Sequence, residues 1–478
     1  MNMKHPVIIQ GGMGIAVSDW KLAKTVSQTG QLGVVSGTAI NSVLVRRLQD
    51  GDKEGHVRRA LRAFPSQEIA EQILASYFIE GGKEPMKPYK RPALFGIQSP
   101  KALLQLNVTA AFVEVFLAKE GHNNPVGINV LEKVLLPNLS CLYGALLAGV
   151  DYVIMGAGIP REIPGALDLL SKSKAASLKV TVDGAASGEE TLTTFDPAEV
   201  MNGVLPQNLK RPYFFPIVSS SILAANLKKK ATGEINGFIV ESPLAGGHNA
   251  PPRGPMKLDE KGEPIYGPRD VVDLKEMAEL GLPFWMAGSY ATPEKLAEVQ
   301  AQGAHGIQVG TLFAFSQESG LTHEVRSEVI RRIANNDVPP QGLIFTDPLS
   351  SPTGFPFKAV RLGKTVADQE TYEKRKRICD LGYLRHAYKK EDGTIGQRCP
   401  AEPVEDYVKK GGKREETVGR KCLCNALMAD IGMPQVQAGG EVEQPLLTAG
   451  DDLNLLGRIL KPGQMSYSAT EVISYLLS

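Results

Sequence analysis

The chain has 478 residues, enough to bury a large core, either as about three ordinary domains or as a single barrel with additions. Its 53 basic and 52 acidic residues leave a formal net charge of +1, which gives no electrostatic footprint for nucleic acid or a membrane surface. Hydrophobic residues make up 42% and charged residues 22%, a composition that excludes a disordered chain.

The N-terminus reads "MNMKHPVIIQGGMG", in which glycines break the apolar run before it reaches the length of a signal peptide. No uninterrupted apolar stretch is long enough to span a bilayer. We therefore expect a cytoplasmic protein with no nucleic-acid or membrane partner.

Short apolar runs typical of strands recur along the first two thirds of the chain. They occupy residues 6–10, 32–37, 93–98, 126–130, 152–156, 213–220, 237–242, 283–289 and 305–310. Helix patterns such as "TPEKLAEVQAQG" lie between many of them, opening on a capping residue and closing on glycine. Apolar strands that alternate with helices predict a parallel sheet buried on both faces. We therefore predict an α/β fold, a TIM-type (β/α)8 barrel. Such a barrel has eight strands, so one of the nine apolar runs is misread or lies outside it.

Several segments are additions to the strands and helices of a minimal barrel. Residues 41–90 predict a helical insertion, residues 181–212 an irregular excursion, and the proline-rich residues 249–270 a long loop that serves as a lid, a binding loop or a mobile segment. We expect the barrel body over residues 1–335 and a C-terminal extension, or a small cysteine-containing subdomain, over residues 336–478.

Small and polar residues gather where the predicted strands end. They are Gly11, Gly12, Ser36, Gly37, Asn129, Gly156, Gly158, Ser219, Gly246, Gly247, Gly288, Gly310 and Thr311. In an eight-stranded barrel the active site is built at the carboxyl ends of the strands. An open doubly wound sheet would concentrate such residues at one switch point instead.

The last two predicted strands end in Gly288-Ser289 and Gly310-Thr311. Small residues there leave backbone N–H groups free to hold a phosphate, although glycine also simply permits tight turns. Gly11 and Gly12 follow the first strand, where backbone without side chains can approach a flat ring. With the Asn129 amide at the same mouth, the pattern suits an aromatic cofactor that carries a phosphate.

His248 follows the apolar run "GFIV" and the segment Ala245-Gly246-Gly247. A lone histidine usually has no part in chemistry, but these glycines would let the ring stand close to a ligand. We therefore take His248 as the candidate catalytic residue.

The segments "PVIIQGGMG", "GIN", "GFIVESPLAGGH", "MAGS" and "GAHGIQVGT" together resemble the nitronate monooxygenase family, formerly called 2-nitropropane dioxygenases. That family includes flavin-dependent enoyl-ACP reductases and NADH:quinone reductases, and the resemblance covers roughly residues 5–320. It implies an FMN-bound barrel in which a histidine, here His248, acts on the substrate beside the flavin. It also implies a set of FMN-binding residues: Gly11, Gly12, Met13, Asn129, Glu241, Gly246, Gly247, Gly288, Gly310 and Thr311.

The sequence departs from the family at positions around the histidine. Leu244 stands where many members have glutamate, Asn249 where they have arginine, and Glu241 where a glutamine is common. The proline-rich loop that follows is a further addition. These departures leave FMN binding as expected and open the question of the substrate.

From the resemblance we predict a nitronate monooxygenase, and two other functions remain open as alternatives to this first one. The first is oxidation of alkyl nitronates by FMN and dioxygen to carbonyl compounds and nitrite, with His248 as base or hydrogen-bond donor. The second is an FMN-dependent NAD(P)H enoyl-thioester or quinone reductase on the same barrel. The third is a non-enzymatic binding component. For either enzyme we expect a small-molecule substrate and a homodimer as the oligomer.

Four of the five cysteines lie in the last hundred residues: Cys379, Cys399, Cys422 and Cys424. Four thiolates could hold zinc or an iron–sulfur centre, but none of the gaps is Cys-x-x-Cys. We favour reduced, packed thiols and predict no metal site.

Overall fold

The computed structural model describes residues 5–207 and 209–478. Eight parallel strands lie in the order β1-β12-β11-β9-β8-β4-β3-β2, and a parallel bridge between Ile9 and Leu32 joins the two ends of the sheet into a barrel. Their bounds are β1 (Ile8–Gln10), β2 (Gly33–Ser36), β3 (Val126–Leu131), β4 (Tyr152–Gly156), β8 (Tyr213–Val218), β9 (Phe238–Glu241), β11 (Phe284–Ala287) and β12 (Gly306–Val309). The predicted TIM-type fold is confirmed. The ninth apolar run, 93–98, forms no strand, so it is the run that lies outside the barrel.

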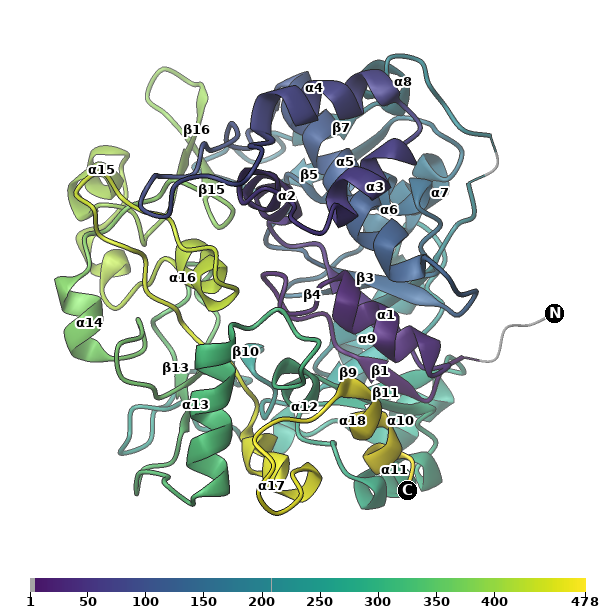
Figure 1. Cartoon of the computed structure of the whole chain (residues 1–478), viewed down its shortest axis with the longest axis vertical. Coiled ribbons are helices and arrows are strands. Elements are labelled where there is room, and N and C mark those ends of the chain that lie inside the picture. Colours follow the sequence, from purple (N-terminus) through teal and green to yellow (C-terminus); the bar gives the residue numbers. More distant parts are fainter. Residues whose placement is uncertain (1–4, 208) are drawn as a thin grey trace.

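Helices surround the strands (Figure 1). Those between or after the barrel strands are α1 (Trp20–Gln28), α6 (Asn138–Leu147), α7 (Ile163–Leu170), α9 (Ser221–Lys230), α10 (Leu274–Glu279), α11 (Pro293–Ala301), α12 (Thr311–Ala314) and α13 (His323–Ala334). Side chains cap two of them, since Asp19 accepts backbone N–H groups of α1 and Thr292, which opens the segment "TPEKLAEVQAQG", accepts one of α11. Inside the barrel, Ile154, Phe215 and Trp285 are fully buried, so the strands are apolar on both faces.

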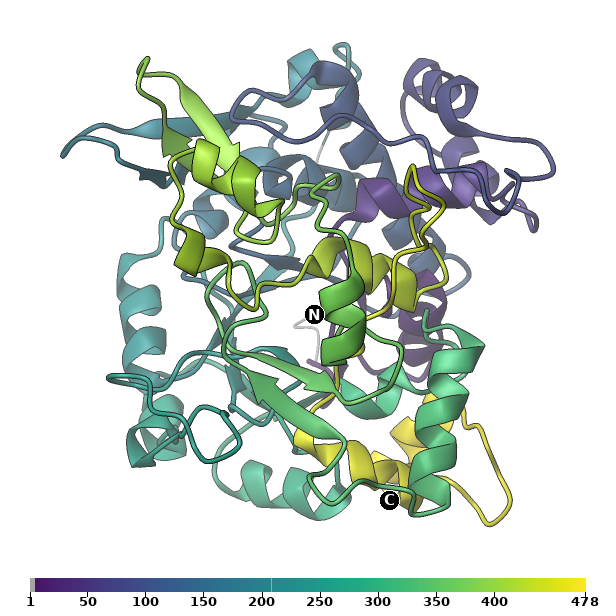
Figure 2. The same cartoon turned by 90° about the vertical axis from the view of Figure 1, so that its left-hand side faces the viewer.

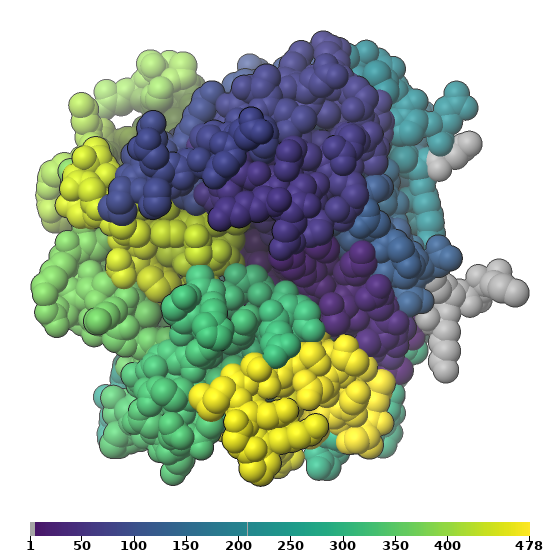
Figure 3. Space-filling model, viewed as in Figure 1, coloured from purple at the N-terminus to yellow at the C-terminus, as the bar shows by residue number. Residues whose placement is uncertain are grey.

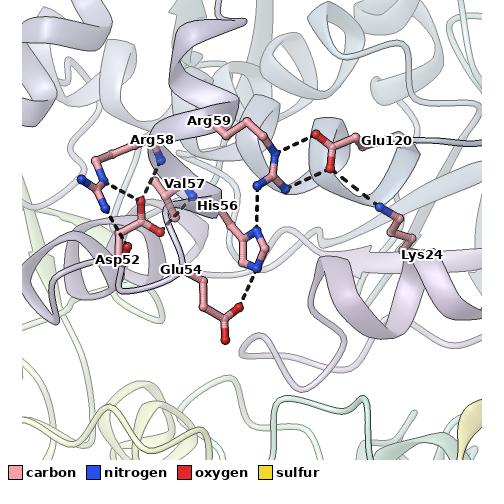
Figure 4. A network of polar contacts seen from close by, with 8 residues as sticks. All are labelled: Lys24, Asp52, Glu54, His56, Val57, Arg58, Arg59 and Glu120. Carbon is pink, nitrogen blue, oxygen red and sulfur yellow. Dashed lines mark hydrogen bonds and ion pairs between the residues drawn. The ribbon is translucent and has the colours of Figure 1, made fainter.

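The segment between β2 and β3 is helical. It contains α2 (Ile40–Gln49), α3 (His56–Arg62), α4 (Gln67–Tyr77) and α5 (Lys101–Lys119). Asp52 accepts the Val57 and Arg58 N–H groups at the start of α3, and Arg59 reaches both carboxylate oxygens of Glu120 beyond α5 (Figure 4). These polar contacts attach α3 to the end of α5.

Helix α5 is long and apolar enough on average to cross a membrane, although polar residues interrupt its apolar sequence. The helix instead lies mostly inside the protein and packs against α1, α2 and α6. Three polar residues within it, Gln105, Asn107 and Glu114, are buried with hydrogen-bond partners in the protein.

The excursion after α7 is built around a hairpin. Strands β5 (Ala176–Val180) and β7 (Thr191–Phe195) pair antiparallel, and the short helix α8 (Pro197–Val200) follows them. Between them, β6 (Val182–Asp183) pairs with β15 (His386–Lys389), which pairs in turn with β16 (Ile395–Arg398). The excursion thereby joins the C-terminal extension.

Residues 336–478 lie along one side of the barrel body and over its mouth (Figures 2 and 3). They contain β13 (Ile344–Asp347), β14 (Phe357–Val360), α14 (Gln369–Lys374), α15 (Val404–Lys409), α16 (Leu423–Asp430), α17 (Leu456–Ile459) and α18 (Ala469–Leu476), besides β15 and β16. Among the described residues there are also three 3-10 turns, η1 (Pro268–Asp270), η2 (Arg414–Thr417) and η3 (Asp451–Leu455). The chain finally returns to the barrel, where α18 packs against α1 and α11.

Candidate active site

The predicted site residues come together at the carboxyl ends of the barrel strands. One cavity of about 220 Å³ is lined by the predicted catalytic residue, His248, and by all the predicted FMN-binding residues: Gly11, Gly12, Met13, Asn129, Glu241, Gly246, Gly247, Gly288, Gly310 and Thr311. The barrel geometry explains this meeting, because parallel strands deliver their carboxyl ends to the same mouth.

Two glycines are required by their surroundings. A Cβ on Gly12 would lie 2.2 Å from the Asn129 Cβ, so only glycine lets the loop after β1 pass close to β3. Gly288 has φ of +89°, and a Cβ there would lie 2.4 Å from the Ser242 hydroxyl oxygen. At these positions the wall of the cavity is bare backbone, as contact with a flat ring requires.

The loop after β1 is fixed by one hydroxyl. Ser18 Oγ accepts the Met13 N–H at 2.8 Å and donates to the Gly11 carbonyl at 2.9 Å. The same oxygen also accepts the side-chain amide of Gln10, which is fully buried in the barrel. The glycines at the mouth therefore belong to an ordered loop.

His248 is held by the extension. It forms β10 (Gly247–His248), which pairs antiparallel with β14, and the Asn249 N–H donates to the Pro356 carbonyl at 2.9 Å. The imidazole packs edge-on against Phe357, with ring centroids 4.9 Å apart, and its Nε2 lies 2.7 Å from Ser351 Oγ. Burial lowers the pKa of His248 to about 4, so the ring is neutral near pH 7.

Glu241 ends β9 with its carboxyl at the cavity. Burial raises the pKa of this carboxyl to about 7. Burial thus reverses the usual order of the two groups, because the pKa of the Glu241 carboxyl lies above that of the His248 imidazole.

Sequence reasoning missed Gln308, a polar residue in the middle of β12. Its side chain lines the cavity, and its buried Oε1 has no hydrogen-bond partner among the described residues. A buried amide oxygen without a partner is costly, so it is suited to accept a hydrogen bond from a ligand. The signal was a glutamine within the otherwise apolar "GIQVG".

The contribution of the extension to the cavity was missed as well. Its residues in the lining are Phe357, Leu427, Thr448, Ala449, Gly450 and Asp452. The Gly450 N–H donates to Thr311 Oγ1 at 3.0 Å, and burial raises the pKa of the Asp452 carboxyl. A carboxyl group thus lies beside the end of β12 that was predicted to hold a phosphate.

Of the positions at which the sequence departs from the family pattern, Glu241 lines the cavity, whereas Leu244, Asn249 and the proline-rich loop do not. Among the described residues of 249–270, none lines the cavity. Asn249 is buried and its amide donates to the Ala245 carbonyl at 2.9 Å, while Leu244 is exposed. These three departures from the family pattern therefore lie beside the lining of this cavity and not in it, and the substrate question that they raise stays open.

The cysteines of the extension pack as thiols. Cys422 and Cys424 belong to an apolar cluster with Phe95 and Met428, and the Cys399 thiol hydrogen-bonds Cys379, which lowers the pKa of Cys379. All five cysteines are free. Within residues 5–207 and 209–478, no three His, Cys, Asp or Glu side chains are grouped as metal ligands.

Comparisons with known proteins add structural likenesses only. No protein-family model matches the chain, and no curated protein matches its sequence. Among solved structures it is similar to FabK from Thermotoga maritima, with 15% identity and a TM-score of 0.48 over 99% of this chain and 92% of that one. It is also similar to nitroalkane oxidase from Streptomyces ansochromogenes, with 14% identity and a TM-score of 0.44 over 98% and 94% of the two chains.

A further similar structure is the enoyl reductase domain of MlnA from the macrolactin biosynthesis cluster of Bacillus amyloliquefaciens, with 10% identity, a TM-score of 0.45 and coverage of 98% and 94%. A nitroalkane oxidase and an enoyl reductase, the kinds of protein to which the motif resemblance points, thus both occur among these structures. The assignment of the barrel itself rests on its strand pairing.

Proposed function

We propose that this protein is an FMN-dependent oxidoreductase that uses NAD(P)H to reduce a neutral substrate, an enoyl thioester or a quinone. The observation that carries the proposal is the lining of the cavity: bare backbone at the strand ends, with His248 as its one basic side chain among the described residues. Such a site offers a flat surface for a ring and one group that can exchange a proton beside it.

The residues fit the cofactor at the ring end. Gly12 and Gly288 keep the wall free of side chains, and the unpartnered Gln308 Oε1 can accept a hydrogen bond from a ring N–H. When bound, FMN supplies the hydride chemistry, and the protein supplies orientation and proton exchange.

At the other end, the backbone of Gly288, Gly310 and Thr311 is proposed to hold the phosphate. The nearby Asp452 is compatible with a phosphate when protonated, and its raised pKa favours that form. FMN binding would then be weaker wherever Asp452 ionises.

The charges favour a neutral substrate over an anion. The cavity has two carboxyl groups, Glu241 and Asp452, and no lysine or arginine among its described lining residues. Because the His248 pKa is about 4, no side chain here offers a positive charge to a preformed nitronate. A neutral imidazole can still hydrogen-bond a carbonyl and deliver a proton to a substrate carbon.

The second candidate is the oxidation of alkyl nitronates with dioxygen to carbonyl compounds and nitrite. The motif resemblance of the sequence favours it, since the segment around His248 is similar to that of the nitronate monooxygenase family. In this reaction His248 would accept the proton of a neutral nitroalkane. The third function, a binding component without catalysis, would leave the unpartnered Gln308 without use.

Anaerobic titration of the FMN-loaded protein separates these functions. We expect NADPH or NADH to bleach the flavin absorption, and a short enoyl thioester or a quinone to restore it. Bleaching by propyl nitronate without any response to either nicotinamide would reverse the order of the two candidates. Protein that takes up no added FMN would support the binding component.

A further inference from the structure

His248 is the first member of a chain of side chains that leaves the cavity. Its Nε2 lies 2.7 Å from Ser351 Oγ, which lies 2.8 Å from Thr353 Oγ1. Ser351 is fully buried, whereas Thr353 is partly exposed. The other ring nitrogen, Nδ1, has no hydrogen-bond partner among the described residues. It is therefore the nitrogen left for a ligand of the cavity.

The far end of this chain reaches a second cavity. Thr353 lines a space of about 410 Å³ between the β5–β6 segment and the extension. The lining there is polar and charged, with Lys133, Asp183 and Arg398 among its residues. Three hydrogen-bonding side chains thus connect the buried cavity to a polar space suited to water.

The turn that holds the hydroxyl groups is firmly built. The Arg420 guanidinium donates to the carbonyls of Leu349 and Ser351, at 2.8 Å and 2.6 Å. The Gly354 N–H donates to the same Ser351 carbonyl at 3.1 Å. The adjacent Ser350 is equally buried, but its Oγ has no partner among the described residues. The contacts of Ser351 are therefore specific to that position.

The hydrogen bonds allow two arrangements of protons. In one, Ser351 donates to Nε2 and the imidazole carries its proton on Nδ1. In the other, Nε2 donates to Ser351, which donates to Thr353, and Nδ1 is free to accept a proton. Each hydroxyl both donates and accepts, so the arrangements interconvert by moving one proton along each bond.

We propose that Ser351 and Thr353 relay protons between His248 Nε2 and water in the second cavity, so that His248 exchanges a proton with the substrate at Nδ1 while remaining neutral. When Nδ1 takes a proton from the substrate, the Nε2 proton passes to Ser351, the Ser351 proton to Thr353, and the Thr353 proton to water. Delivery to the substrate is the reverse. Only the assignment of His248 to the substrate rests on the proposed function.

The relay also explains how a buried histidine can work. Burial holds the His248 pKa near 4, so storing a proton as imidazolium is unfavourable near neutral pH. With the relay, one proton leaves as another arrives. Ser351 and Thr353 are in this sense positioning and transfer residues that act through His248.

The kinetic test compares three variants of the FMN-loaded protein. We expect Ser351→Ala to lower kcat by about 10²-fold and Thr353→Val by a smaller factor, with KM and FMN content unchanged. Ser350→Ala, the matched control, should keep the wild-type kcat. An unchanged kcat in both Ser351→Ala and Thr353→Val would overturn the relay.

A second measurement needs neither flavin nor activity. In protein labelled with ¹⁵N in the histidine rings, and with the His248 signals assigned by their loss in His248→Gln, NMR reports which nitrogen carries the proton and how fast it exchanges with water. We expect a shifted Nε2 signal in Ser351→Ala and slower exchange in Ser351→Ala and Thr353→Val. Spectra and exchange rates identical to those of the wild type would reject the relay, whether or not the protein proves to be a flavoenzyme. Thr353→Val, at a partly exposed position, covers the case in which Ser351→Ala does not fold.

Discussion

The barrel body and the C-terminal extension contribute to the same cavity in different ways. From the barrel come strand ends and bare backbone, at Gly12, Gly288 and Gly310. From the extension come side chains, such as Ser351 against His248 and Asp452 beside Thr311. The barrel therefore provides the space in which a ligand can lie, while side chains of the extension contact the polar groups around that space.

The largest expected effect concerns the reactive group that the two regions share. His248→Gln should lower kcat by about 10²- to 10⁴-fold, because it removes the group that exchanges a proton with the substrate. FMN content should be unchanged, since the proposed contacts to the cofactor come from the backbone at Gly12, Gly288 and Gly310, which we call the flavin cradle. Steady-state kinetics and the flavin absorption of the purified variant provide the measurement.

The loss in His248→Gln should be at least as large as that in Ser351→Ala, which leaves the imidazole in place. A larger loss in Ser351→Ala would mean that the extension, and not the barrel loop, provides the main catalytic group.

Gly12→Ala tests the backbone contacts at the mouth of the barrel. The added methyl group would lie 2.2 Å from the Asn129 Cβ, so the loop or β3 must move, at a cost of about 3 kcal/mol in the free energy of unfolding. We expect weaker FMN binding, measured by equilibrium titration, and a lower midpoint of urea unfolding.

Gly363→Ala is the control in the extension, where an added Cβ meets nothing within 4 Å and the backbone has no positive φ. Equal FMN affinity in Gly12→Ala and Gly363→Ala would contradict the proposal that the backbone at Gly12 contacts the flavin.

Glu241→Gln tests the electrostatics of the barrel end. Because burial raises the folded-state pKa to about 7, ionisation of Glu241 costs stability as pH rises from the unfolded value of 4.5 toward 7. The variant, which has no charge to bury, should be more stable than the wild type at pH 8 by up to about 3 kcal/mol and by much less at pH 5. Urea unfolding of the flavin-free protein at both pH values measures the difference.

The exposed Glu298 on α11 serves for comparison. If Glu298→Gln and Glu241→Gln gave the same small change at pH 8, the carboxyl at the end of β9 would not be buried.

The smallest expected effect belongs to the extension. Asp452→Asn removes a carboxylate near Thr311 and should tighten FMN binding at pH 8 by about five- to tenfold, since a like charge beside a phosphate costs about 1 kcal/mol. Asp451→Asn is the neighbouring control, because Asp451 pairs with Lys358 at 2.7 Å and does not line the cavity. Weaker FMN binding in Asp452→Asn would mean that this side chain helps to hold the cofactor.

The two regions also differ in how far the sequence predicted them. Strands of the barrel repeat one local pattern, an apolar run that ends in glycine or a small polar residue, so their order and the candidate residues at their ends could be read without a structure. The run 93–98 was the exception, because it pairs with no strand: Phe95 is buried in an apolar cluster, while Leu94 is exposed.

The contribution of the extension could not be read in this way. Pairing of β10 with β14, and of β6 with β15, joins residues more than one hundred positions apart in strands of two to four residues. Strands this short carry no periodicity. Ser351 reaches His248 only through that pairing, and Gln308 faces the cavity only because the barrel closes.

The central claim is that the strand ends at the barrel mouth form a flavin cradle. Its most direct test is the visible spectrum of the purified protein after addition of FMN and removal of free cofactor by gel filtration, beside Gly12→Ala treated in the same way. We predict that the wild-type protein keeps one FMN per chain with an altered flavin spectrum, and that the variant keeps less. Wild-type protein that leaves the column colourless would contradict the account.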